Sequence, residues 1–376
     1  MSTSIKKLLL LFIAITGYIT FASAQTSDTL FKPANILKTM ERVADWQLNT
    51  WQQKGQRWPK YDWTNATGYT GLLDLGKLSK DDKYIQYLVG IGNDLNWNTG
   101  PRRLMADDYC IGQTYANLYM MYKDDKMIAK FRAQADTIAA LPHTESLAWK
   151  HNIQMREWAW CDAMFMGPTS LAYLSTATGD QKYLNTAVKL WWKTYNYLYD
   201  PREHLYFRDS SYFTKRENNG AKVFWSRGNG WVMGGLVRVI DNMPANYPDR
   251  KKFIKLYKDM ASRIAQLQQP DGSWHASLLD PASYPVKEAS GTGFYTYALL
   301  CGLNNGTLDK KIYWPVVQKA WAALSACVQP DGMLGYVQQI GAAPDKVNEN
   351  STEIYGIGAF LLTGTQLYKY VENGEK

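Results

Sequence analysis

The sequence predicts an all-α fold, an (α/α)6 toroid in which six inner helices alternate along the chain with six outer helices. Two interleaved repeats predict this architecture. In the first repeat, a polar or aromatic loop leads through glycine into an apolar helix rich in small residues. Its six copies centre on Gly68, Gly112, Gly167, Gly230, Gly293 and Gly356. The last three steps between these glycines are each 63 residues, as expected of a true internal repeat.

The second repeat is an acidic turn followed by a basic residue and a longer amphipathic helix. It starts at Asp81, Asp124, Asp180, Asp249 and Asp309. Aspartate at such a position caps a helix and complements its dipole. Two of these helices end in the same Gln-Pro-Asp-Gly turn, at 269–272 and 329–332. Outer helices need one apolar face and inner helices are packed on every side, so the amphipathic set is assigned to the outside.

The two ends of the chain indicate how the repeats close. An amphipathic helix over roughly 33–53 has no preceding partner, and the last glycine-rich helix, to about Val371, has no following one. If these two helices pair, a ring closes. A tandem solenoid is the competing geometry, and the unpaired terminal helices favour the ring.

In such a ring all inner helices run in the same direction, so the loops before them meet at one end, which we call the mouth. The loops are 61–69, 106–110, 157–162, 224–229, 287–292 and 348–355. The N-termini of the inner helices also point toward the mouth, and their dipoles favour a bound anion there.

Length and composition indicate one large folded unit behind an export signal. The chain has 376 residues and 46% hydrophobic residues, which excludes a disordered class. Residues 1–24 read as a signal peptide, with Lys6 and Lys7 before an apolar run and Ala22-Ser23-Ala24 as the cleavage pattern. We therefore expect a secreted or periplasmic protein whose catalytic domain spans 25–376; an uncleaved anchor is the alternative. No other apolar run is long enough for a membrane span.

The charge and the cysteine and histidine content limit which ligands and cofactors are expected. The formal charge of +8 falls to +6 without residues 1–24, and the basic residues are scattered. This pattern argues against nucleic acid and suits an acidic oligosaccharide. We expect no metal and no other cofactor, because the four His have no ligand-like spacing. The oligomeric state stays open. Buried free thiols are expected at Cys110, Cys161, Cys301 and Cys327.

Aromatic residues are in excess, with 15 Trp and 26 Tyr in the chain. Flat rings with a polar tip are typical of sugar-binding clefts, and a Trp-rich helical core is the alternative. The repeat divides the two roles by position. Tryptophans inside outer helices should pack, as at 191, 192 and 321. Those near the starts of inner helices should line the mouth: Trp63, Trp158, Trp160, Trp225 and Trp231.

Two acidic segments precede inner helices. Asp162 follows Trp158 and Trp160, where burial should raise its pKa and suit it to act as a general acid. An N-cap for the third inner helix is the alternative role. Asp107 and Asp108 precede the second inner helix. One of the two can hold a proton near Asp162 or orient water; capping is the alternative, and which one faces the mouth stays open.

The segment 225–231, Trp-Ser-Arg-Gly-Asn-Gly-Trp, is a candidate binding site. Arg227 offers a planar fork for a carboxylate, and Trp225 and Trp231 can stack on sugar. A structural Arg–Asp pair is the alternative for Arg227. Tyr69, at the first inner helix, is a further candidate for substrate contact. Segments 287–293 and 350–353 should supply polar groups to the mouth.

These motifs resemble a known family. Trp160-Cys161-Asp162 with a following Pro168, together with the 225–231 motif, is similar to the unsaturated rhamnogalacturonyl hydrolases of glycoside hydrolase family 105. The related unsaturated glucuronyl hydrolases share the toroid, and the resemblance covers most of the mature chain. It implies removal of a 4,5-unsaturated uronic acid, galacturonyl or glucuronyl, from the non-reducing end of lyase-generated oligosaccharides.

The resemblance also implies roles for particular residues. Asp162 would protonate C4 of the enol ether, water would add at C5, and the resulting hemiketal would open and expel the aglycone. The acidic pair carries the family's second Asp, and Asp107 fits the spacing slightly better than Asp108. Trp160, Trp225 and Arg227 fall at positions that contact the sugar and its carboxylate.

One departure from the family concerns Arg208, which stands where a His is expected after an aromatic stretch at 205–207. Arginine cannot act as a base, but it can bind a carboxylate, so the identity of the sugar stays open. Two other functions remain as alternatives. One is a different glycosidase or a polysaccharide lyase on the same toroid, with Tyr69 or Tyr355 as base. The other is a non-enzymatic sugar-binding ring.

Overall fold

The computed structural model describes residues 29–150 and 154–374. The expected signal peptide, residues 1–24, lies outside the described residues. Within them, no helix combines the length and the apolar character needed to cross a bilayer.

Twelve long helices of the described chain form two concentric layers, as the repeat predicts. The inner helices are α3 (Trp63–Leu78), α5 (Gly112–Tyr122), α8 (Ala163–Thr178), α10 (Ser226–Asp241), α12 (Ala289–Asn304) and α14 (Ile354–Gly374). The outer helices are α2 (Pro33–Lys54), α4 (Lys83–Asp94), α6 (Lys126–Ala139), α9 (Gln181–Leu198), α11 (Arg250–Gln266) and α13 (Lys310–Ser325). The predicted (α/α)6 fold is confirmed.

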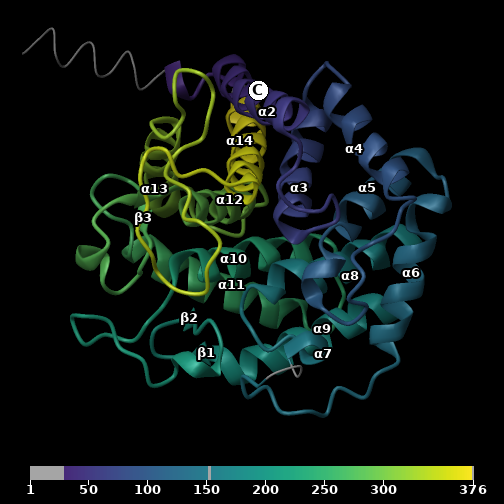
Figure 1. The fold of residues 1–376 in the computed structure, drawn as a ribbon. Helices are drawn as coiled ribbons and strands as arrows, with labels where there is room; N and C mark the ends of the chain where they lie inside the picture. The colour runs from purple at the N-terminus through teal and green to yellow at the C-terminus, as the bar shows by residue number, and fades with distance from the viewer. Residues whose placement is uncertain (1–28, 151–153, 375–376) are drawn as a thin grey trace, which may run out of the picture.

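The ring closes through its terminal helices. Each inner helix contacts the next one along the chain, and α14 contacts both α12 and α3. The first outer helix, α2, packs on α14. Figure 1 shows the chain travelling once round the ring, so that yellow α14 returns beside purple α2. The described helices therefore form a closed toroid rather than an open solenoid.

Small residues in the inner helices allow their backbones to approach closely. A Cβ atom built on Gly71 of α3 would lie 2.6 Å from the carbonyl oxygen of Gly358 in α14. One built on Gly235 of α10 would lie 2.6 Å from the carbonyl oxygen of Met164 in α8. Larger side chains at these positions would push the inner helices apart, which explains the small residues of the first repeat.

The acidic turns of the second repeat bind the first residues of outer helices, with one exception, and two of them, Asp180 and Asp309, are the N-cap residues themselves. Four of them accept the backbone N–H two residues further on, at 2.7–3.2 Å: Asp81, Asp124, Asp180 and Asp309. Asp249 precedes α11 without making a side-chain cap bond. The two Pro-Asp-Gly turns also form as predicted, with φ of 85° at Gly272 and 101° at Gly332, which only glycine adopts without strain.

The remaining short elements all lie in loops that lead into inner helices. They are η1 (Ala106–Tyr109), α7 (Gln154–Glu157), β1 (Tyr199–Asp200), β2 (Leu205–Tyr206), η2 (Ser210–Tyr212), β3 (Trp274–His275), η3 (Pro281–Ser283) and β4 (Lys287–Glu288). The strands form two antiparallel pairs, β1 with β2 and β3 with β4. These additions therefore elaborate the mouth. The four cysteines are free and buried, as expected.

Candidate active site

Asp162 occupies the N-cap position of α8, but its carboxylate makes no capping hydrogen bond. The side chain is 15% exposed. Its Oδ2 lies 3.6 Å from Nε of Arg208 and accepts a contact from Sγ of Cys161 at 3.5 Å. The carboxylate is therefore not engaged as a cap and is free to exchange a proton with a ligand at the mouth.

The surroundings of Asp162 favour its protonated form. Removal from solvent raises the pKa of Asp162, while the guanidinium groups of Arg208 and Arg227 oppose that rise in part. Burial also raises the pKa of Asp107 to about 7, an effect that Arg102 opposes and the charge of Asp162 reinforces. Burial therefore raises the pKa of both carboxyl groups, and the charge of Asp162 adds to the rise at Asp107, which suits acid and base groups that work near neutral pH.

The structure separates the roles of the adjacent aspartates. Asp108 is 1% exposed. Its Oδ1 accepts bonds from Nη2 and Nε of Arg102 at 2.5 and 3.0 Å, and its Oδ2 accepts the Arg102 backbone N–H at 2.6 Å. Asp107 is partly exposed, and Ile111, not either aspartate, is the N-cap of α5. Asp108 holds its loop together, whereas Asp107 is the partly exposed carboxylate on whose pKa the charge of Asp162 acts.

Arg227 lies in the first turn of α10 and is 1% exposed. Its Nη1 and Nη2 donate to the carbonyl oxygens of Gln338 and Gln339 at 2.6 and 2.9 Å. Its guanidinium lies 4.5 Å from the ring centroid of Trp225 and 4.9 Å from that of Tyr355. Within 29–150 and 154–374 no carboxylate forms an ion pair with it, so the expected alternative of a structural Arg–Asp pair is not seen. A bound carboxylate would supply the missing counter-charge.

The segment around Gln338 holds both residues of the 225–231 motif in place. Nε1 of Trp225 donates to Oε1 of Gln338 at 2.9 Å. The backbone N–H of Gln338 donates to Glu288 at 3.0 Å, and Glu288 also caps α12. Sequence reasoning missed Gln338 because it supports Arg227 through its backbone carbonyl, which no side-chain pattern reveals.

Arg208 reaches Asp162 from the loop after β2. Besides its approach to Asp162, its Nη1 donates to Oδ2 of Asp209 at 2.7 Å, and its guanidinium lies 4.5 Å from the ring centroid of Trp149. The backbone N–H of Cys161 donates to the Arg208 carbonyl at 2.8 Å, which fixes the two loops together. Trp149 also contacts Trp160 edge to face at 6.4 Å. Trp149 was missed, and only the general aromatic excess could have indicated it.

The remaining aromatic candidates divide between mouth and core. Trp63 stacks on Tyr355 with ring centroids 5.4 Å apart. Trp231 is fully buried between Phe165 and Phe294, at 5.2 and 4.4 Å. The structure therefore places Trp231 in packing below the mouth and offers no exposed face for a sugar.

Tyr69 also lies away from the other candidates. It is fully buried, its hydroxyl accepts from Nε2 of Gln56 at 3.0 Å, and its ring contacts Trp51 of outer helix α2 at 5.9 Å. Because an inner helix is packed on all sides, a residue near its start can face the outer layer instead of the mouth. The structure therefore brings together Asp162, Asp107, Arg208 and Arg227, but not Tyr69. Trp225 and Trp160 lie beside them but are only 2% and 3% exposed, so, like Trp231, they pack around the site and do not present the open faces that were expected for sugar stacking.

Comparison with known proteins places this geometry in a family. The family model for Glycosyl Hydrolase Family 88 matches residues 39–371. An unsaturated 3S-rhamnoglycuronyl hydrolase of Formosa agariphila is 40% identical over 323 residues, covering 83% of this chain and 85% of that protein. A protein of the same description from an Alteromonas species is 35% identical, over 81% of this chain and 77% of its own.

Solved structures agree with the fold. A glycosyl hydrolase family 88 structure from Bacteroides vulgatus has a TM-score of 0.81 and 31% identity, covering 90% of this chain and 99% of its own. A structure described as a polysaccharide lyase has the same TM-score with 32% identity, covering 90% and 98%. A possible family 105 member from Salmonella enterica shares the fold alone, with 18% identity, a TM-score of 0.75 and coverage of 91% and 95%. The chain is a glycoside hydrolase and belongs to glycosyl hydrolase family 88.

Proposed function

We propose that this enzyme removes a 4,5-unsaturated uronic acid from the non-reducing end of oligosaccharides that a polysaccharide lyase has produced, with rhamnose as the neighbouring sugar. The observation that carries the proposal is the pairing of a partly exposed Asp162, whose pKa is raised, with the buried Arg227, whose hydrogen bonds go to carbonyl groups. A proton donor beside an uncompensated cation suits a substrate that carries both a carboxylate and a protonatable double bond. The names of the two bacterial relatives support rhamnose as the neighbour.

The proposal gives each charged residue a role. Arg227, with Arg208 beside it, binds the uronate carboxylate and so places the adjacent C4=C5 bond near Asp162. Binding of an anion there also offsets the two cations that lower the pKa of Asp162. The substrate therefore promotes the protonated form of its own general acid.

The reaction then proceeds by protonation and hydration. The Asp162 carboxyl donates its proton to C4, and positive charge develops at C5 and the ring oxygen. Water adds to C5 and returns a proton to the Asp162 carboxylate. The C5 hemiketal opens to a ketone, which leaves C1 as a hemiacetal that expels the aglycone. Asp107, whose pKa is raised by burial and by the charge of Asp162, helps to hold the proton between these steps.

The experiment is a spectroscopic screen of unsaturated disaccharides from pectin, glycosaminoglycan, ulvan and arabinogalactan sources. Hydration destroys the conjugated double bond, so its ultraviolet absorbance should fall, fastest with rhamnose-linked substrates. Constant absorbance with every substrate would refute the proposal. A rise of absorbance on intact polymer would instead show a lyase, the activity for which one structural neighbour is named.

The finer placement of the enzyme belongs to the same proposal. We assign it to the rhamnose-specific enzymes that resemble family 105, and we propose that residues 1–24 are a signal peptide that directs it to the periplasm or outside the cell. Sequencing of the mature N-terminus after expression in a Gram-negative host should start at Gln25. An N-terminus at Met1 on the exported or the cell-associated protein would contradict cleavage.

A further inference from the structure

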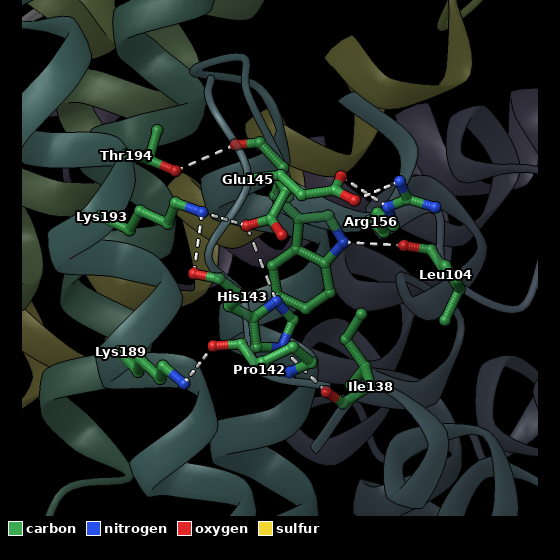
Figure 2. A network of polar contacts seen from close by, with 11 residues as sticks. Leu104, Ile138, Pro142, His143, Glu145, Arg156, Lys189, Lys193 and Thr194 are labelled. Atoms are coloured by element: carbon green, nitrogen blue, oxygen red, sulfur yellow. Dashed lines mark hydrogen bonds and ion pairs between the residues drawn. The ribbon is translucent and has the colours of Figure 1, made fainter. Parts of the chain in front are cut away.

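A buried polar network that the proposed reaction does not use joins α6, α9 and the loop before α8 (Figure 2). Glu157 is 3% exposed and forms an ion pair with Nζ of Lys193 on α9. Nζ of Lys193 also donates to the carbonyl oxygen of His143 at 2.9 Å. A ring nitrogen of His143 lies 2.8 Å from the carbonyl oxygen of Ile138. The network thus ties the loop before α8 to two outer helices.

Trp158, the residue after Glu157, has a strained backbone. Its φ is 55°, in the left-handed region that bulky residues rarely adopt. Its carbonyl oxygen accepts a bond from Oγ1 of the fully buried Thr194 at 2.9 Å. Such a conformation persists only where the surroundings determine it several times over, and it is typical of functional sites. Here Thr194 and the Glu157–Lys193 pair clamp the peptide on both sides.

The indole of Trp158 joins the two loops that carry the paired carboxylates. Its Nε1 donates to the carbonyl oxygen of Leu104 at 2.9 Å. Leu104 precedes Asp107 by three residues, and Trp158 precedes Asp162 by four. The ring also packs edge to face on Tyr109 at 5.6 Å. A Cβ atom on Gly167 would lie 2.6 Å from the indole, so the ring has no room to shift.

We infer that Trp158 is a positioning residue: its indole acts as a strut that sets the separation of the Asp107 and Asp162 carboxyl groups, and the buried clamp of Thr194, Glu157 and Lys193 holds it in place. This inference rests on the proposed function in one respect: the rate of the proposed reaction is the measurement that reports the separation of the two carboxyl groups. The residue touches no substrate in this account. Its buried ring also explains why a tryptophan expected to line the mouth is instead part of the support beneath it.

Trp158→Phe tests the strut because it removes the Nε1–H and shortens the ring. We expect kcat to fall about tenfold to a hundredfold, as displaced reacting groups do, while KM changes less than twofold because Arg227 is untouched. The matched control is Trp192→Phe, beside Lys193 on α9. That indole also packs on aromatic rings, Tyr195 and Phe253, at 5.0 and 4.8 Å. It should leave both constants unchanged.

A second readout needs no turnover. The charges that act on Asp107 come from Arg102, Asp108, Asp62 and Asp162. Of these four residues, Asp162 lies on the other loop that the Trp158 indole holds in place. The unfolding midpoint is measured from pH 4 to 8 for four proteins: the wild type, Asp107→Asn, Trp158→Phe and the double variant. In each background, the difference between the midpoints with Asp107 and with Asn at that position gives the part of the pH dependence that is due to Asp107. Loosening the strut should shift that part toward lower pH, because repulsion from Asp162 weakens. An unshifted curve would overturn the inference even if the enzyme proved inactive on every unsaturated sugar.

Thr194 supplies a milder pair of variants in case Trp158→Phe fails to fold. Thr194→Val removes the hydroxyl that holds the Trp158 carbonyl and should lower kcat several-fold, whereas Thr194→Ser keeps the hydroxyl and should restore it. Equal kcat in the two variants would show that the Thr194 hydroxyl does not help to hold Trp158 in place. If Trp158→Phe changed kcat and KM to a similar extent and left the pH curves unshifted, the tryptophan would be merely structural, and this result would also overturn the inference. Inactivity of the wild type on every substrate would refute the proposed function instead.

Discussion

Two aspartates at the mouth of the ring, Asp107 and Asp162, differ from those at the opposite end. At the end where outer helices begin, Asp81 and Asp180 accept backbone N–H bonds and pair with lysines, and these bonds lower the pKa of each carboxyl. At the mouth, where inner helices begin, burial raises the pKa of Asp107 and of Asp162. Aspartate therefore stabilises helix starts at one end, whereas at the mouth Asp107 and Asp162 have the raised pKa values that the proposed proton transfer needs.

Asp162→Asn should abolish turnover, because it removes the only proposed proton donor while leaving the size of the side chain unchanged. We expect a loss of more than about a thousandfold in kcat. The measurement is the decay of the double-bond absorbance. Asp309→Asn is the control at the opposite end: its carboxylate caps α13, asparagine caps equally well, and kcat should stay the same. Residual activity of Asp162→Asn above a tenth of wild type would remove Asp162 from its role.

The adjacent pair at 107 and 108 should separate activity from stability. Asp107→Asn should lower kcat roughly a hundredfold with little loss of stability. Asp108→Asn should cost about 2 kcal/mol of unfolding free energy, because it weakens charged bonds to Arg102, with kcat nearly unchanged. Steady-state kinetics and chemical denaturation of both variants give the comparison. The reverse assignment of effects would show that Asp108 is the partner of Asp162.

Arg227→Lys should raise KM about tenfold and lower kcat less. Lysine keeps the charge but loses the fork that donates to both carbonyl groups and the flat face between Trp225 and Tyr355. Initial rates over a range of substrate concentration give both constants. An unchanged KM would mean that the uronate carboxylate binds elsewhere at the mouth.

The smallest effects concern stability and pH. A raised folded-state pKa adds stability at low pH that is lost as the pH rises through the folded value, here about 7 for Asp107. Asp107→Asn should therefore raise the unfolding midpoint at pH 8 relative to wild type, and much less at pH 4. Asp180→Ala should lower the unfolding free energy by about 1 kcal/mol, and the midpoint with it, through loss of the cap. A scanning calorimetry series for both variants checks this, and midpoints that move in the same direction at pH 8 would contradict the contrast.

Most of the fold could be predicted from the sequence because the ring is built from internal repeats. The glycine-led segment recurs six times and the acidic turn five times, so the helices, the closing pair and the mouth could be predicted without coordinates. The same pattern placed Asp162, Asp107 and Arg227 at one end. Spacing alone could not separate Asp107 from Asp108, since that choice depends on a bond network with Arg102.

The orientation of side chains on the inner helices could not be predicted in the same way. Trp158 precedes an inner helix and Tyr69 and Trp231 lie in the second turn of one, yet all three are fully buried. An inner helix has no polar face, so its hydrophobic pattern does not show which side points to the mouth. Gln338 was missed for another reason: it contributes a carbonyl oxygen from an irregular segment, where residue identity carries little information.

The most direct test of the central claim uses a matched pair of disaccharides, a uronyl-rhamnose with the C4=C5 bond and its saturated counterpart, given to the wild type and to Asp162→Asn. If Asp162 protonates the double bond, only the unsaturated sugar is cleaved, free rhamnose appears in step with the loss of absorbance, and Asp162→Asn cleaves neither. Cleavage of the saturated sugar at a similar rate, or cleavage of the unsaturated one by Asp162→Asn, would contradict the account.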